Sequence, residues 1–326
     1  MAAPRIQLIF GTANVNDGGA FSTAEQTLEL LDALEKEGIK QIDTAQLYGT
    51  SEQLLGEIKA PSRFLMDTKH IGGWLPGVSS RAEVVQRGLE SLKKLGVDKV
   101  NVFYLHAPDD TNPLEDTLAG VNDLYQQGKF EKFGLSNFNV EEVKAVIEIT
   151  KEKGFVAPTV YQGNYNPISR KTETDLFPLL RENGISFYAY STMAGGFLAK
   201  SVAQLTQPSG GDGRWDKSTI IGEVYHAMYN KPKLLEALVQ WEEISKSSGI
   251  PKAELAYRWV AHNSILKEHL GDGIVLGASR ISQLQQTVAG LNNGPLPESA
   301  AKAIDDIWQL VKDDALADNF DTRRKN

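Results

Sequence analysis

The chain of 326 residues contains no cysteine and only five histidines. The absence of thiols excludes disulfide bonds, zinc–thiolate sites, iron–sulfur clusters and a cysteine nucleophile. A metal-dependent barrel hydrolase is the least favoured class, because only His70 and His106 follow early strands and Lys69 lies next to His70. No metal is therefore expected.

Long hydrophobic runs are also missing. The N-terminal sequence M-A-A-P-R-I-Q-L-I-F lacks the apolar core of a signal peptide, and no stretch approaches the length of a membrane span. A cytoplasmic protein without a membrane partner is therefore expected. The net charge of −8 is spread along the chain, and the only basic cluster, Arg323–Lys325, is interpreted as a frayed, solvated tail. No nucleic-acid partner is expected.

Eight short apolar runs alternate with helical patterns along the whole chain. The runs predicted as strands are residues 6–10, 39–43, 64–68, 99–105, 131–135, 158–162, 185–190 and 273–276. Ser22 begins a predicted capping box, and Asn139 precedes an acidic, apolar-periodic stretch. Strict alternation of strand and helix, with strands too apolar to have one wet face, indicates a parallel sheet.

Eight such units predict an α/β fold of the (β/α)₈ TIM-barrel class, in one domain over residues 1–326. The competing doubly wound sheet would place G-x-G-x-x-G after its first strand, where this chain has Gly11-Thr12-Ala13-Asn14. Residues 195–231 are rich in glycine and are predicted to form a long loop that covers the strand ends. Residues 297–316 are expected to form an extra helix, followed by the tail 317–326.

Polar side chains follow three consecutive predicted strands, at the rim where barrel enzymes hold their catalytic groups. These residues are Asp43 and Tyr48 after strand two, Lys69 at strand three and His106 at strand four. A phenol is a poor acid at neutral pH, but a neighbouring ammonium favours the phenolate, and a carboxylate holds that ammonium in place. The set suits proton donation to a carbonyl oxygen, with His106 as a hydrogen-bond donor.

Each of these four residues has an ordinary structural alternative. Asp43 also fits a helix N-cap, Tyr48 and Lys69 fit a solvated rim, and His106 fits a partner for a buried backbone group. Their joint occurrence at consecutive strand ends favours the catalytic interpretation.

Motifs at the ends of strands two and four to eight, together with the lysine that closes strand three, resemble those of the aldo-keto reductase superfamily. They are D-T-A-x-x-Y-G at 43–49, L-H-x-P at 105–108, G-L-S-N-F at 134–138, Q-G-N-Y-N at 162–166, A-Y-S-T-M-A-G-G at 189–196 and L-G-A-S at 276–279. The resemblance covers nearly the whole chain. It is strongest to the branch that contains the aflatoxin-aldehyde reductases, through F-Y-L-H-A-P-D at 103–109 and A-G-G-F-L at 194–198.

This resemblance implies an NADPH-dependent reductase with Tyr48 as the acid and Asp43, Lys69 and His106 completing a tetrad. It also implies a set of cofactor-binding residues, which comprises Ser136, Asn137, Gln162, Tyr190, Ser191, Met193, Gly195, Gly277, Ser279, Arg280, Gln283 and Gln286. Ser136, Asn137 and Gln162 would hold the nicotinamide carboxamide, and the ring of Tyr190 would stack on the nicotinamide.

Two residues depart from the family pattern: Thr192 replaces a usual proline, and Thr287 replaces a common asparagine. Arg280 is the candidate for a 2′-phosphate contact, and it equally fits a solvated residue at a helix start. Candidate walls of a site for a small-molecule carbonyl substrate are Asn14, Val15, Trp74, Tyr225, Tyr229 and Phe320, and Arg214 is a candidate to attract an acidic substrate. The aromatic ones equally fit loop packing. A homodimer is a possible assembly, and a redox-sensing regulatory subunit with slow turnover is the alternative function.

Overall fold

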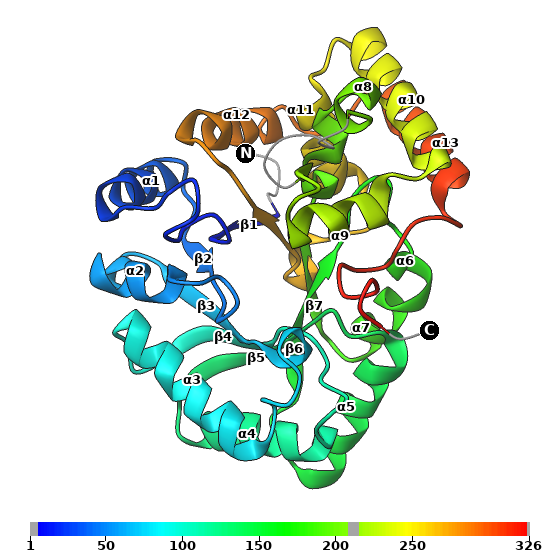
Figure 1. The fold of residues 1–326 in the computed structure, drawn as a ribbon. Coiled ribbons are helices and arrows are strands. Elements are labelled where there is room, and N and C mark those ends of the chain that lie inside the picture. The colour runs from blue at the N-terminus through cyan, green and yellow to red at the C-terminus, as the bar shows by residue number, and fades with distance from the viewer. Residues whose placement is uncertain (1–5, 208–214, 325–326) are drawn as a thin grey trace.

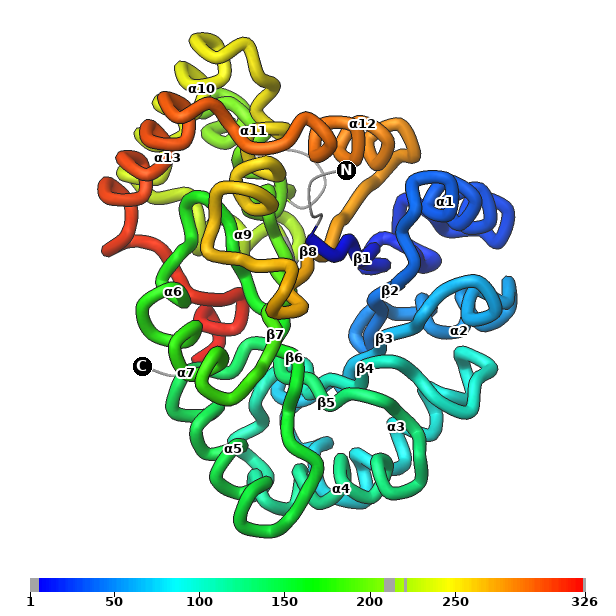
Figure 2. Tube along the Cα trace, turned by 180° about the vertical axis from the view of Figure 1, so that it is seen from behind, coloured from blue at the N-terminus to red at the C-terminus, as the bar shows by residue number. Residues whose placement is uncertain are grey.

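The computed structural model describes residues 6–207 and 215–324, and within them eight parallel strands close into a barrel (Figure 1). The strands are β1 (Gln7–Gly11), β2 (Gln41–Asp43), β3 (Leu65–His70), β4 (Val100–Leu105), β5 (Phe130–Ser136), β6 (Pro158–Asn164), β7 (Ser186–Tyr190) and β8 (Gly273–Leu276). Each strand overlaps the run predicted for it, so the predicted (β/α)₈ barrel is confirmed. Figure 2 shows β1 beside β8, where the barrel closes.

Helices surround the barrel and join successive strands. The first five are α1 (Ala24–Lys36), α2 (Ser51–Glu57), α3 (Arg81–Leu95), α4 (Leu114–Gln126) and α5 (Val140–Lys153). They are followed by α6 (Thr172–Asp175), α7 (Phe177–Glu182), α8 (Val202–Leu205), α9 (Ile220–Tyr229), α10 (Pro232–Ser248), α11 (Lys252–Arg258), α12 (Ile281–Leu291) and α13 (Glu298–Val311). The extra helix predicted over 297–316 is α13, which packs against α10. None of the helices in the described part of the chain is long and apolar enough to cross a membrane.

Helix starts follow the capping chemistry of the sequence, with one correction. The capping box of α1 is formed by Thr23 with Gln26, not by Ser22. The predicted start at Asn139 is confirmed, because Asn139 accepts from the backbone N–H of Glu142, whose side chain accepts from the N–H of Asn139. Such reciprocal bonds satisfy N–H groups that a helix start leaves unpaired.

The segment 195–231 differs from the predicted long loop. It contains the 3₁₀ turn Ala194–Ala199 and the helices α8 and α9. Thr219 caps α9 by accepting from the N–H of Gly222. The glycines Gly210, Gly211 and Gly213 before this helix and Gly222 within it obscured the ten-residue helical stretch in the sequence. Residues 208–214 lie outside the described part.

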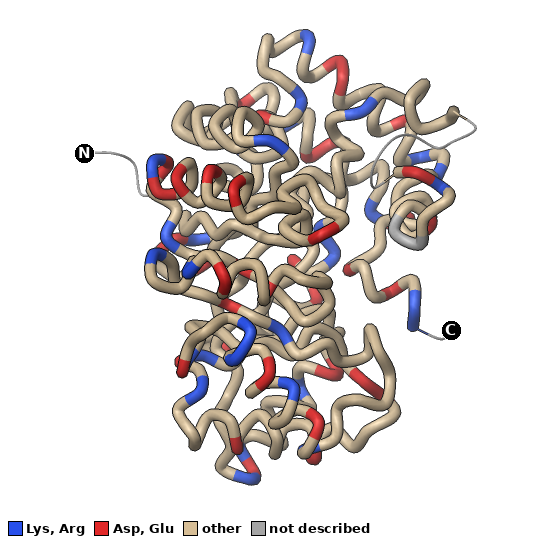
Figure 3. The backbone as a smooth tube through the Cα atoms, turned by 60° about the vertical axis from the view of Figure 1, so that its left-hand side comes forward, with Lys and Arg blue, Asp and Glu red and all other residues tan. Residues whose placement is uncertain are grey.

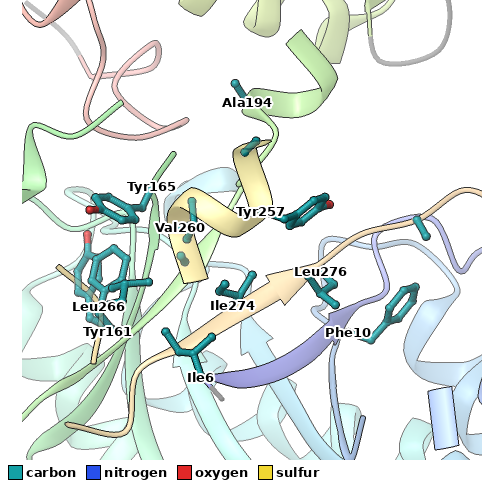
Figure 4. Close-up of a cluster of buried hydrophobic side chains, with 14 of the residues drawn as sticks. Ile6, Phe10, Tyr161, Tyr165, Ala194, Tyr257, Val260, Leu266, Ile274 and Leu276 are labelled. Atoms are coloured by element: carbon teal, nitrogen blue, oxygen red, sulfur yellow. The ribbon is translucent and has the colours of Figure 1, made fainter. Parts of the chain in front are cut away.

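Two hydrophobic clusters form the core. The larger cluster lies between the strands and the helices, and Figure 4 shows Ile274 and Leu276 of β8 facing the helical segment that carries Tyr257 and Val260. The smaller cluster includes Ile9, Val102, Tyr104, Val160 and Tyr188. Acidic and basic residues are interspersed along the chain rather than gathered into blocks of one sign (Figure 3).

Candidate active site

The turn after β2 presents Tyr48 at the carboxyl end of the barrel. Its backbone N–H donates to the carbonyl of Ala45 at 3.0 Å, and Gly49 continues the turn with φ of +61°. Gln46, within the same turn, accepts from the N–H of Ile71 and donates to Ser91. These bonds tie the turn to β3 and α3, so the position of the phenol is set by neighbours on both sides.

Lys69 and Asp43 form a fully buried ion pair under this turn. The ammonium lies 2.5 Å from Asp43 Oδ2 and also donates to the carbonyl of Thr44 at 2.9 Å. The other oxygen, Asp43 Oδ1, accepts from Gln162 Nε2 at 2.9 Å. Lys69 Nζ lies 5.1 Å from the ring centroid of Tyr48. The structure therefore brings the first three residues of the predicted tetrad together.

His106 completes the group from the end of β4. Its ring meets the Tyr48 ring edge-on, with the centroids 5.8 Å apart and the planes at 85°. Trp74 flanks it at 5.9 Å. The loop of Trp74 approaches closely because Gly73 has no side chain: a Cβ there would lie 2.0 Å from the carbonyl oxygen of Pro108.

Lys69 and His106 differ in charge at neutral pH, because burial and neighbouring charges shift their pKa values in opposite directions. Burial by itself lowers the pKa of Lys69, but the charge of Asp43, with that of Tyr48 and Asp67, more than offsets burial, and the net pKa is raised. Lys69 is therefore a permanent cation at neutral pH. Burial lowers the pKa of His106 well below its usual value, and the charge of Lys69 lowers it further. His106 is thus a neutral imidazole that can donate a hydrogen bond without carrying charge.

The candidate carboxamide residues lie beside this group at the ends of β5, β6 and β7. Ser136, Asn137 and Gln162 are all buried. Asn137 adopts φ of +61°, donates from Nδ2 to the carbonyl of His106 at 2.8 Å, and accepts from the Tyr190 hydroxyl at 2.6 Å. Tyr190 is half-buried, so part of the residue remains accessible to a ligand.

The segment after β7 has an unusual backbone. Ser191, Ala194 and Gly195 all have positive φ, and Met193 lies among them, half-buried. A Cβ on Gly195 would lie 1.9 Å from Tyr225 Cε1, so Tyr225 packs directly on this turn.

Tyr225 and Tyr229 do not form an exposed substrate wall. Both are nearly fully buried and pack with Phe197 and Trp215, whose indole N–H donates to the carbonyl of Gly195 at 2.9 Å. The loop-packing alternative is therefore correct for these two tyrosines. They support the turn that follows β7.

The candidate adenosine-side residues lie after β8, around the start of α12. Gly277, Ser279, Arg280, Gln283 and Gln286 are all exposed. The backbone N–H and the hydroxyl of Ser279 both donate to Gln283 Oε1. A Cβ on Gly277 would meet nothing within 4 Å, so the surface there is open.

Among the predicted substrate residues, Trp74 and Phe320 pack edge-on with centroids 5.1 Å apart. Asn14 is half-buried and donates weakly to the carbonyl of Ala278 at 3.5 Å. Val15 is fully buried and belongs to the larger hydrophobic cluster. Arg214 lies outside the described residues.

The C-terminal segment corrects another expectation. Arg324 is not a frayed, solvated residue: it bonds to Asp318, Asp321 and Glu142 and donates to the carbonyl of Asn137 at 2.6 Å. In Figure 1 the segment after α13 runs back toward β6 and β7. Local sequence gave no sign of this, because Glu142 and Asn137 lie more than 180 positions away.

The residues present fit a nicotinamide dinucleotide and a carbonyl substrate. Among the described residues, His106 Nδ1 and Trp74 Nε1 are buried without a hydrogen-bond partner. The His106 ring contacts the rings of both Tyr48 and Trp74. Buried polar atoms are normally hydrogen-bonded, so unpaired ones in a site indicate room for ligand atoms. The amides after β5 and β6 and the glycine turn after β7 supply the remaining surfaces.

Sequence reasoning missed Asp67, a third charged residue close to the tetrad. Its side chain is fully buried, and it is the register partner of Asp43 on the adjacent strand. The signal was available, because residues two apart on a strand face the same side, so Asp67 shares its face of the strand with Lys69.

A parallel (β/α)₈ barrel with a tyrosine, a buried lysine–aspartate pair and a neutral histidine at its carboxyl end defines the class of carbonyl oxidoreductases that use a nicotinamide cofactor. The sequence model of the "Aldo/keto reductase family" matches residues 7–309 of the chain. The chain belongs to the aldo/keto reductase family, and the resemblance seen in the sequence is confirmed.

Three relatives illustrate the similarity. Oxidoreductase sirO of Leptosphaeria maculans is 40% identical over 319 residues, which are 95% of this chain and 96% of that protein. Human aflatoxin B1 aldehyde reductase member 2 is 35% identical, over 94% of this chain and 88% of that protein. Aldo-keto reductase pigE of Monascus ruber is 29% identical, over 93% of both chains. The protein is an oxidoreductase that acts on carbonyl compounds.

Proposed function

We propose that the protein reduces an aldehyde or ketone of a small molecule to an alcohol with NADPH, and that Tyr48 donates the proton. The observation that carries this proposal is the contact of the Tyr48 ring with both Lys69 and a neutral His106. A bound reduced nicotinamide supplies a hydride, and the residues of the chain hold the carbonyl and provide the proton.

The substrate oxygen lies between the Tyr48 hydroxyl and His106 in this proposal. His106 donates a hydrogen bond to that oxygen and, being neutral, leaves proton delivery to the phenol. Lys69 stabilises the phenolate that forms as Tyr48 gives up its proton. Asp43 keeps Lys69 charged and fixed, and Gln162 fixes Asp43.

The cofactor would lie across the ends of β5 to β8. Ser136, Asn137 and Gln162 offer amide and hydroxyl groups for the carboxamide, and the Tyr190 ring can stack on the nicotinamide. The turn around Gly195, supported by Tyr225, suits the pyrophosphate because its backbone is already shaped in the free protein.

The preference for NADPH is proposed to come from the start of α12. Helix starts attract phosphate through their free N–H groups and their dipole. Arg280 directly precedes Ile281, the first residue of this helix, and is exposed, so its guanidinium can reach a 2′-phosphate.

Trp74 and Phe320 are proposed to flank the substrate. Their edge-on packing forms an apolar surface beside His106, which favours a substrate with an apolar or aromatic group next to its carbonyl. Asn14 would contribute a polar contact from the β1 side.

The proposal is tested by following NADPH oxidation with a panel of small aldehydes and ketones. We expect steady turnover, and we expect Tyr48→Phe to reduce it about 10²- to 10⁴-fold because the general acid is lost. Tyr48→Phe should still bind NADPH, as measured by quenching of tryptophan fluorescence. Tight NADPH binding without turnover on any carbonyl would instead favour a regulatory subunit.

The cofactor preference is tested separately. Arg280→Met should weaken NADPH binding and leave NADH binding unchanged. An unaltered NADPH/NADH ratio would remove Arg280 from the phosphate site without affecting the proposal for Tyr48.

A further inference from the structure

The interior of the barrel holds a second carboxylate next to the tetrad. Asp67 lies on β3 two residues before Lys69, so both side chains face the same side of the strand. In the register of the sheet, Asp67 is paired with Asp43 of β2 and with Val102 of β4. Neighbouring strands are about 4.8 Å apart, so the two aspartates are close neighbours. Neither is measurably accessible to solvent.

Both oxygens of Asp67 are held by hydrogen-bond donors. Oδ1 accepts from Asn101 Nδ2 at 2.8 Å and from the backbone N–H of Val102 at 3.2 Å. Oδ2 accepts from Gln41 Nε2. Three donors of this kind favour the ionised carboxylate.

The Gln41 amide continues a chain of hydrogen bonds through the barrel. Gln41 Oε1 accepts from Gln7 Nε2, and Gln7 Oε1 accepts from the Tyr188 hydroxyl at 3.5 Å. Side-chain amides can turn over, which exchanges donor and acceptor at each step. If both amides turn, Gln41 presents its oxygen to Asp67 and Tyr188 accepts from Gln7. This chain of hydrogen bonds can therefore pair with a protonated Asp67 as well as with an ionised one.

Charged and titratable groups on four strands face Asp67. Asp43 faces it from β2, Lys69 from β3, Tyr104 from β4 and Tyr188 from β7. Burial raises the pKa of Asp67 to about 7, and the charge of Asp43 adds to this, against the donors Gln41 and Asn101 and the cation Lys69. Asp67 thus changes its charge near neutral pH, while Lys69 stays positive.

Lys69 is the cation shared by Asp43, Asp67 and the ring of Tyr48. An ionised Asp67 adds a negative charge that disfavours a phenolate on Tyr48. A neutral Asp67 removes this opposition. The step that depends on this balance is the transfer of the Tyr48 proton to the substrate oxygen.

We propose that Asp67 is a positioning residue of the reduction, and that its charge, acting through the Lys69–Asp43 pair, sets the acidity of Tyr48. This inference rests on the proposed function, in which Tyr48 is the proton donor. Asp67 itself contacts neither the substrate nor the cofactor, because Gln41, Asn101 and Val102 occupy both of its oxygens.

The test is the pH dependence of a single turnover with pre-bound NADPH, measured for wild type and Asp67→Asn. Asparagine keeps the size of the side chain, and the reversible amide chain can pair with it. We expect the alkaline fall of the rate in Asp67→Asn to begin about one pH unit lower than in wild type, at the low end of what a neighbouring like charge produces. A wild-type inflection near neutral pH should also be lost in the variant.

Glu52→Gln is the matched control. Glu52 is equally buried, but it lies on α2 and accepts from Thr68, the β3 residue that faces away from the barrel interior. The charge of Lys69 is the smallest of the influences on the pKa of Glu52, after burial, Thr68, Ser91 and Lys94. Its profile should coincide with that of wild type. Profiles for Asp67→Asn that differ from wild type by a constant factor alone, or an equal shift in Glu52→Gln, would overturn the proposal.

Two further measurements keep the outcome unambiguous. Burial also raises the pKa values of Glu52 and Asp318, so the informative quantity is the infrared difference between wild type and Asp67→Asn. This difference should contain a protonated-carboxyl band that titrates near neutral pH, and its absence would also overturn the proposal. If Asp67→Asn does not fold, Asn101→Leu removes a donor that favours the ionised form, so the inflection should move to higher pH.

A fully active Tyr48→Phe would refute the proposed function, whereas an inactive Tyr48→Phe with an unchanged Asp67→Asn profile would refute this inference alone.

Discussion

Replacing Lys69 by methionine removes the cation beside Asp43 while nearly keeping the length of the side chain. The ammonium is fully buried, and its loss breaks the 2.5 Å contact with Asp43 and the bond to the carbonyl of Thr44. Removing one partner of a buried pair leaves an uncompensated charge and destabilises a protein by about 3–5 kcal/mol. At about 2 °C per kcal/mol for a chain of this size, the unfolding midpoint should fall by about 6–10 °C.

Thermal and urea unfolding of Lys69→Met, Asp43→Asn and the double variant provide the assay. The double variant removes both charges, so its loss should be smaller than the sum of the single losses, with a coupling of about 2–3 kcal/mol. Arg81→Met, which breaks the exposed pair with Asp123, is the control and should leave the midpoint essentially unchanged.

The pH dependence of this prediction has a definite sign. The pKa of Lys69 is higher in the folded protein than its ordinary value, so its contribution is fully present below the unfolded pKa of about 10.4 and is lost as the pH rises through the folded pKa. The stability difference between wild type and Lys69→Met should therefore shrink above about pH 10. Below that it should grow as the pH rises through neutrality, because Lys69 also lowers the pKa of Asp67 and its loss makes the ionised Asp67 more costly to keep buried. A Lys69→Met protein as stable as wild type, or additive single and double variants, would refute the argument for a coupled buried pair.

Three further predictions concern other parts of the molecule. Gly195→Ala should weaken NADPH binding at least tenfold in a fluorescence titration, because its Cβ would overlap the ring of Tyr225; binding equal to wild type would mean that this turn does not contact the cofactor. Arg324→Ala should make the C-terminal segment more sensitive to limited proteolysis, since four contacts are lost, whereas Lys302→Ala in the exposed pair with Asp306 should not. Burial lowers the pKa of His70 to about 4. The stability present above pH 6.5, where His70 is neutral in both states, is therefore lost as the pH falls toward 4, in total roughly 3 kcal/mol. His70→Gln should flatten the acid side of the plot of unfolding free energy against pH, and an unchanged acid side would contradict the lowered pKa of His70.

The sequence predicted the barrel and its rim because both follow from short-range patterns. Apolar runs alternating with helical periodicity leave few architectures, and strand ends of a parallel barrel meet at one end. Asp43, Lys69 and His106 could therefore be placed together before their contacts were known. Asp67 required only the two-residue period of the same strand.

The remaining differences depend on contacts that no local pattern encodes. In the sequence, Tyr225 and Tyr229 look the same whether they line an exposed site or pack inside a loop. Only their contacts with Phe197 and Trp215 show that they are buried. Arg324 is the middle residue of a basic cluster near the C-terminus, and its carboxylate partner Glu142 belongs to a distant helix. Helix α9 was hidden by the glycines that precede it and by Gly222 within it.

The central claim is that a hydride reaches the carbonyl carbon while Tyr48 protonates the oxygen. Its most direct test is a single turnover with NADPH deuterated at C4 of the nicotinamide, followed by NMR of the alcohol formed from an aldehyde. The account predicts deuterium on the carbinol carbon for wild type, and the same product formed about 10²- to 10⁴-fold more slowly by Tyr48→Phe. An alcohol without deuterium from either C4 position, or an equal rate in Tyr48→Phe, would contradict it.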